Sequence, residues 1–113
     1  MKVIAKPSAP SIVGWLEEGE CLIVLAVSVV QHEGIKFLLW SDKQHSVALF
    51  PGEDFDVVDG CLSRRWIFNF NSQGFLYLAP DLWQAEEFWE KYHDGDLAAE
   101  QAFEKEKILI FSE

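Results

Sequence analysis

The sequence predicts an α+β fold, in which an antiparallel, meandering sheet of about five to six strands carries C-terminal helices packed on one face. Short apolar segments separated by turn residues fill residues 1–80, and from residue 81 the apolar residues follow a helical spacing. Half of the 113 residues are hydrophobic, which is enough for a core and excludes a disordered chain. The length and the lack of an internal repeat favour one domain over residues 1–113.

The pattern of prolines and apolar residues predicts the first elements. Residues 2–5 suit a short edge strand that ends before Pro7, because proline interrupts a sheet. Residues 11–18 suit a short helical turn with Ser11 as its N-cap. The run 21–30, CLIVLAVSVV, is apolar without alternation, which predicts one central strand covered on both faces.

Further strands are expected between polar or glycine-containing turns. They comprise residues 35–40, 46–50, 55–58, 65–70 and 75–78. In the segment 65–70 the side chains alternate, with Trp66, Phe68 and Phe70 on one face of the strand and the remaining residues on the other.

Two helices are expected after residue 80. The first spans 81–93, where the apolar residues are Leu82, Ala85, Phe88, Trp89 and Tyr92. Asp81 followed by Gln84 resembles a capping box at its start. Asp96 is expected to cap a second helix over 97–107. The apolar tail 108–111 is expected to form an extra strand or a packed terminus.

The net charge of −10 is concentrated in the last third of the chain. Residues 1–80 hold six basic and nine acidic residues, a net of −3, and residues 81–113 hold three basic and ten acidic residues, a net of −7. Such a field repels nucleic-acid phosphates and anionic membranes, and it attracts cationic proteins. The alternative is that the acidity only keeps the protein in solution.

The acidic residues give the candidate partner-binding positions. The first set lies in and after the first expected helix and comprises Glu86, Glu87, Glu90, Asp94 and Asp96. A second patch comprises Glu53, Asp54 and Asp56. Leu82 and Trp83 are adjacent and cannot both face inward fully, so Trp83 or Phe88 is expected to reach the surface beside the acids as an aromatic anchor. The alternative is that Trp83 packs against a loop.

No catalytic, metal or cofactor motif is present. The sequence lacks GxSxG, GxxxxGK[ST] and GxGxxG, and no histidine lies four residues from another histidine or cysteine. The acids around Asp54 and Asp56 do not have the spacing of a calcium loop. We therefore expect no enzyme activity, no metal and no cofactor. A dyad of Cys61 with a histidine that meets it only in the fold stays open.

The two cysteines, Cys21 and Cys61, lie near apolar runs and are expected to be buried free thiols, with a disulfide as the alternative. The first fifteen residues lack the long apolar segment of a signal peptide, and the run 21–30 is too short to span a bilayer. A cytoplasmic location is therefore expected.

Two stretches carry a resemblance to a known class of proteins. The stretches are LFPGEDFDVVDGCLSRRW and APDLWQAEEFWEKYHDGD. With these stretches, its small size and its acidic composition, the chain resembles the immunity proteins of bacterial contact-dependent growth inhibition and related polymorphic toxin systems. The resemblance spans about residues 35–106 and transfers no binding residue. It implies a cytoplasmic protein that binds and blocks a cognate toxin domain, which in many of these systems is a basic nuclease.

The leading functional hypothesis is thus an immunity protein that neutralises a basic toxin through an acidic surface. The alternative is an adaptor or regulatory domain with a non-toxin partner, and a small enzyme using Cys61 is a third hypothesis.

Overall fold

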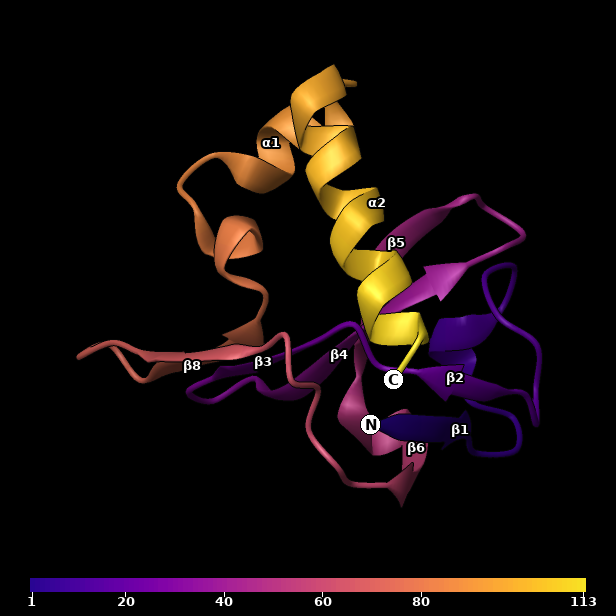
Figure 1. The fold of residues 1–113 in the computed structure, drawn as a ribbon. Helices are drawn as coiled ribbons and strands as arrows, with labels where there is room; N and C mark the ends of the chain where they lie inside the picture. The colour runs from indigo at the N-terminus through magenta and orange to yellow at the C-terminus, as the bar shows by residue number, and fades with distance from the viewer.

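The computed structural model describes all 113 residues and contains eight strands and two C-terminal α-helices (Figure 1). The strands are β1 (Lys2–Ala5), β2 (Cys21–Ile23), β3 (Ala26–Val30), β4 (Gly34–Ser41), β5 (Ser46–Pro51), β6 (Phe55–Asp59), β7 (Ile67–Phe70) and β8 (Phe75–Ala79). The helices are α1 (Phe88–His93) and α2 (Leu97–Phe111), with short 3-10 turns η1 (Pro10–Ile12), η2 (Gly52–Asp54) and η3 (Asp81–Gln84). The predicted α+β class, antiparallel and with C-terminal helices, is confirmed.

The strands form two sheets, whereas the sequence predicted one. The larger has the order β5-β4-β3-β8-β7 and the smaller has the order β2-β1-β6, and all neighbours are antiparallel. The predicted central strand 21–30 is divided between them. Val24 N–H donates to Met1 C=O in the small sheet, while Leu25 N–H donates to Leu38 C=O in the large one. Both residues are fully buried, so the continuous apolar run marks a crossing between two sheets.

The two faces of the five-stranded sheet have different covers. We call the face that carries η3, α1 and α2 the upper face and the opposite one the lower face (Figure 1). The small sheet covers the lower face at its β4–β5 end. There Phe55 of β6 packs edge-on against Phe37 and Phe50, with ring centroids 6.1 and 6.2 Å apart. This packing leaves the β7 end of the lower face without a covering layer.

The predicted helix 81–93 is interrupted. η3 ends at Gln84, Ala85 is extended, and Glu87 has a φ of 65° before α1 begins. No side chain caps η3, so the predicted capping box at Asp81 is wrong. The cap of the second helix is confirmed, because the Asp96 carboxylate accepts from Ala99 N–H at 3.0 Å.

The apolar tail 108–111 completes α2 as its last turn. Ile110 is 2% exposed and joins the core there, so the tail forms a packed terminus and not an extra strand. No helix of the structure is long and apolar enough to cross a membrane.

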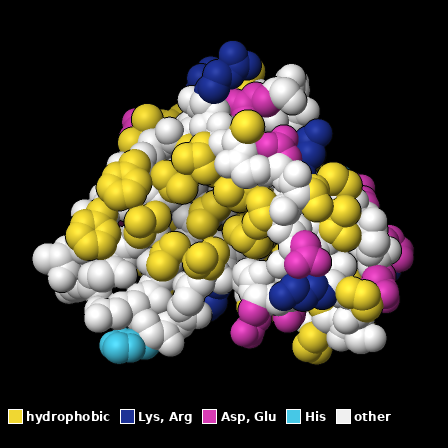
Figure 2. All heavy atoms as spheres, turned by 90° about the horizontal axis from the view of Figure 1, so that it is seen from below, with side chains coloured by type: hydrophobic (Ala, Val, Ile, Leu, Met, Phe, Trp, Pro, Cys, Tyr) yellow, Lys and Arg dark blue, Asp and Glu magenta, His cyan; other side chains and the backbone are white.

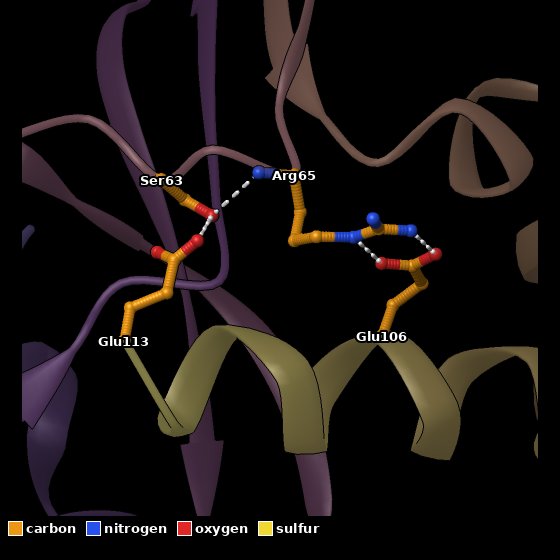
Figure 3. A network of polar contacts seen from close by, with 4 residues as sticks. All are labelled: Ser63, Arg65, Glu106 and Glu113. Atoms are coloured by element: carbon orange, nitrogen blue, oxygen red, sulfur yellow. Dashed lines mark hydrogen bonds and ion pairs between the residues drawn. The ribbon is translucent and has the colours of Figure 1, made fainter.

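A polar network fastens α2 to the segment that leads into β7 (Figure 3). The Arg65 guanidinium donates through Nε and Nη2 to the two oxygens of Glu106, at 2.8 and 2.7 Å. At the end of the helix, Glu113 Oε1 accepts from Ser63 Oγ at 3.0 Å and from Arg64 N–H at 2.9 Å. The Arg65 N–H in turn donates to Ser63 Oγ. These bonds hold the C-terminal helix and the start of β7 together.

The paired Glu106 makes the stability of the fold depend on pH. Its side chain is only 7% exposed, and the hydrogen bonds from Arg65 lower the pKa of the carboxyl below its ordinary value of 4.5. A lowered carboxyl pKa stabilises the folded state above the ordinary value, and this stability is lost as the pH falls through the folded-state pKa.

Arg65→Met removes the partner of a buried carboxylate, so we expect a lower free energy of unfolding at pH 7. The deficit relative to the wild type should shrink as the pH falls below the ordinary carboxyl value of 4.5 and through the lowered pKa of Glu106, because the protonated side chain no longer needs a cationic partner. Urea unfolding, monitored by tryptophan fluorescence, measures the free energy of unfolding at each pH. Arg64→Met is the matched control, because the Arg64 side chain forms no ion pair. An equal loss in both variants would contradict the role of this pair.

Candidate functional site

The first set of predicted acidic residues lies on one exposed segment. Glu86 and Glu87 precede α1, Glu90 lies on it, and Asp94 and Asp96 follow it. All five are exposed, and none takes part in an ion pair. We call residues 86–96 the acidic segment. Asp96 also caps α2, whereas no side-chain hydrogen bond engages the other four carboxylates, which leaves them free for a partner.

Aromatic side chains hold the acidic segment against the sheet. Phe103 of α2 is 1% exposed and stacks on Trp83 with ring centroids 5.0 Å apart and an interplanar angle of 19°. Tyr92 and Trp89 of α1 contact the same ring at 4.7 and 6.0 Å, and Trp40 of β4 contacts it at 6.1 Å. We call these five residues the aromatic cluster. Two of its rings, Phe103 and Trp83, are buried and the other three are half-buried, so the cluster supports the segment from below.

The predicted surface position of Trp83 is wrong, and so is the alternative at Phe88, which is 7% exposed. The residue is 1% exposed and is packed within the aromatic cluster, whereas its neighbour Leu82 is half exposed. The adjacency argument was correct that only one of the two residues can face inward, but η3 turns Trp83 inward and leaves Leu82 outside. The indole N–H of Trp83 has no hydrogen-bond partner. Trp83 therefore supports the acidic segment from below and does not contact a partner directly.

The second predicted patch does not join the first. Glu53 and Asp54 lie in η2 and Asp56 lies in β6, and Figure 1 places β6 and α1 at opposite ends of the molecule. Asp54 accepts a hydrogen bond from Ser11 Oγ at 2.6 Å, which fastens the N-terminal segment to η2. Glu53 and Asp56 are exposed. The structure therefore offers two separate acidic surfaces, of which the segment around α1 is the denser.

The largest cavity has a volume of about 410 Å³ and lies between β2, β4 and α2. Its wall includes Trp40, over whose ring the Lys107 ammonium lies 3.7 Å from the centroid. Glu104 pairs with the same ammonium at 3.1 Å. The chain's own cation therefore covers the face of Trp40 that borders this cavity, where a cationic ligand would otherwise bind.

Both cysteines are free, as expected, but exposed, so their predicted burial is wrong. Cys61 lies in the loop after β6, where its N–H donates to Asp59 Oδ1 at 2.9 Å and thereby lowers the pKa of that carboxyl. The shallow pocket beside Cys61 contains Asp59, Arg64 and Glu113 and no histidine. No group of three histidine, cysteine or acidic side chains lies close enough to hold a metal ion.

A second surface, which the sequence analysis missed, lies on the lower face at the β7 end. Cross-strand partners share a face, so Phe68, Leu78 and Val27 form one row across β7, β8 and β3. The next row is Phe70, Leu76, Val29 and Ile35. Phe68 and Phe70 are 63% and 61% exposed. Figure 2, which views the molecule from below, shows the broad apolar area that such side chains form over this part of the sheet.

The predicted alternation in 65–70 is present, but it does not bring all three aromatic residues into the core. Trp66 is buried and its indole N–H donates to Leu25 C=O at 2.9 Å, whereas Phe68 and Phe70 face solvent. One signal for this surface is present in the sequence. The fifteen residues Trp66–Pro80 contain no Asp, Glu, Lys, Arg or His, although a quarter of the chain is charged.

We expect Phe103→Ala to destabilise the fold by about 3–4 kcal/mol, because it removes the ring at the centre of the aromatic cluster and leaves a cavity. The acidic segment should then exchange its amide hydrogens faster than it does in the wild type. Urea unfolding and hydrogen exchange measure the two effects. Leu97→Ala on the same helix is the control, since Leu97 is 67% exposed. Equal stability of the two variants would show that the cluster does not hold the segment.

Comparisons with known proteins return no relative. No family model matches the chain, and no curated protein or solved structure matches it either.

Proposed function

We propose that this chain is an inhibitor of the immunity-protein kind, which binds a basic toxin domain in the cytoplasm through the acidic segment and neutralises it. The observation that carries the proposal is the set of exposed carboxylates in residues 86–96, which have no cationic partner in the chain and are fixed by the aromatic cluster. Binding alone accounts for this role, so it requires no catalytic group.

The arrangement of the acids favours binding over a general role in solubility. Solubility needs charge but no fixed geometry, whereas these carboxylates surround a short helix whose other side is anchored by Phe88, Trp89 and Tyr92. Glu87 also adopts a φ of 65°, in the left-handed region. Such a conformation costs a non-glycine residue about 1 kcal/mol or more and is concentrated at functional sites. Rigid support reduces the entropy that an interface must otherwise lose on binding.

A basic nuclease is a suitable partner in physical terms. Its substrate cleft presents lysine and arginine side chains to phosphates, and fixed carboxylates can occupy the same positions. The unpaired negative charge also accelerates the encounter with such a partner at low ionic strength. Binding of this kind should weaken as salt is added, because exposed charges are screened over about 10 Å at 0.1 M salt.

The test is a charge reversal of the acidic segment. The triple variant Glu86→Lys, Glu87→Lys, Glu90→Lys should raise the dissociation constant for the product of the adjacent gene about 100-fold at low salt. It should also reduce the dependence of binding on salt. Calorimetry or surface plasmon resonance at two salt concentrations measures both effects.

The matched control is Glu18→Lys, Glu20→Lys, Glu33→Lys, which changes the net charge equally at exposed positions outside the segment. It should bind nearly as the wild type does. Equal weakening by both triple variants would show that net charge matters and the segment does not. Tight binding through the segment without inhibition of the partner's activity would favour the adaptor role over the inhibitor role.

A further inference from the structure

β7 is the least protected edge strand of the protein. Proteins guard sheet edges with charge, proline, short strands or a covering element. The free edge at β6 carries Asp56 and Asp59, and the one at β5 ends in Pro51. β2 has three residues and borders α2 across the largest cavity. β7, with the sequence IFNF, is one residue longer than β2, carries no charge and no proline, and all four of its residues are exposed.

The free backbone groups of this edge belong to the two exposed phenylalanines. Asn71 N–H donates to Phe75 C=O at 3.0 Å at the end of the β7–β8 hairpin. Hydrogen-bonded pairs alternate along an antiparallel ladder, so Asn69 and Ile67 form the next bonded pairs with β8. The N–H and C=O groups of Phe68 and Phe70 therefore point away from the sheet, where no other strand lies.

We propose that β7 pairs antiparallel with β7 of a second copy of this chain, with Phe68 of each copy opposite Phe70 of the other. The segment Phe68-Asn69-Phe70 is self-complementary about Asn69, as a twofold axis requires. Each of the two Phe68–Phe70 pairs exchanges both of its backbone hydrogen bonds. The two Asn69 residues face each other on the twofold axis and exchange no backbone hydrogen bond. The Cα atoms of such a pair lie closer together than those of a hydrogen-bonded pair. The phenyl rings of both copies meet on the lower face.

The charge distribution selects a second copy as the occupant of this edge. A chain of net charge −10 repels itself, yet the stretch from Trp66 to Pro80 contains no ionisable charge on either side of the contact. A basic protein would find no carboxylate on this strand to pair with. The pairing therefore uses the longest stretch of the sequence without a charged residue, where two copies do not repel each other, and it does not depend on the proposed inhibitor function.

The space around β7 also fits this register. On the upper face, Asn71 of the second copy lies opposite Ile67. A cavity of about 320 Å³ opens beside Ile67 and Asn69, bordered by Asp81, Leu82 and Ala85, so no covering element blocks the approach of a strand there. The Asn71 side chain of the second copy stays in its own hairpin turn, where its Oδ1 accepts from Gln73 N–H and Phe75 N–H. On the lower face the four phenyl rings bury on the order of 250 Å² of their surface per copy. This is less than the ~800 Å² per partner of a standard interface, so the dimer should be weak and should form only as the protein concentration rises.

The experiment introduces a positive charge at Asn69 in one variant and a negative charge in another. Asn69 is exposed, and its side chain lies on the upper face with Tyr77 and Ser28. In the proposed dimer, Asn69→Lys places two ammonium groups opposite each other, and Asn69→Glu places two carboxylates there. Sedimentation velocity from about 5 to about 500 μM should show the wild type shifting from 12.9 kDa towards twice this mass. Each variant alone should dimerise at least about tenfold more weakly.

An equimolar mixture of Asn69→Lys and Asn69→Glu should regain the dimer, because the opposite charges now face each other across the axis. Asn69→Thr is the neutral control and should behave as the wild type does. A wild type that stays monomeric at every concentration overturns the proposal. Dimerisation that is equally strong in all variants also overturns it, because the copies would then meet through another surface such as the lower face.

Discussion

The contact between Phe103 and the four rings around it determines how the C-terminal third of this protein is arranged. Phe103 is the residue through which α2 meets η3, α1 and β4 at one point, since Trp83, Trp89, Tyr92 and Trp40 all contact its ring. α1 has only six residues and would be unstable alone, because short helices gain their stability from packing. The acidic segment therefore has a defined shape only as long as this ring is in place.

The same packing separates the two kinds of side chain in the segment. Every aromatic residue of 81–93 turns towards Phe103 or the sheet, so the acids between them are left on the outside. Burial raises the pKa of Tyr92, and the carboxylates of Glu100 and Glu104 reinforce this effect, so the hydroxyl at the base of the segment stays neutral. The result is an uncharged base beneath a charged surface. This arrangement places the charges of the segment at the surface and leaves no unpaired charge in the core.

The alternation of apolar segments and turns predicted the fold class, whereas features that depend on tertiary packing were predicted poorly. Among the local signals, the cap at Asp96 is present and the capping box at Asp81 is not. The Asp96 cap involves atoms three residues apart, so its sequence pattern was sufficient. The run 21–30 shows that its residues are buried, but not that Val24 and Leu25 bond to different sheets, because their partners Met1 and Leu38 are distant in sequence. Trp83 was misplaced because a helical period was assumed through Ala85, where the chain is extended.

The exposure of Phe68 and Phe70 follows from strand order and not from composition. β7 lies at the end of β5-β4-β3-β8-β7, whereas the small sheet reaches the lower face from the β4–β5 end, where Phe55 contacts Phe37 and Phe50. Neither covering layer of the chain therefore reaches β7 on the lower face. The helices pack on the upper face, and the small sheet packs on the lower face at the β4–β5 end. An alternating aromatic strand normally indicates a buried face. Here the element that would complete the burial does not exist within the chain, so the apolar row ends at an open edge.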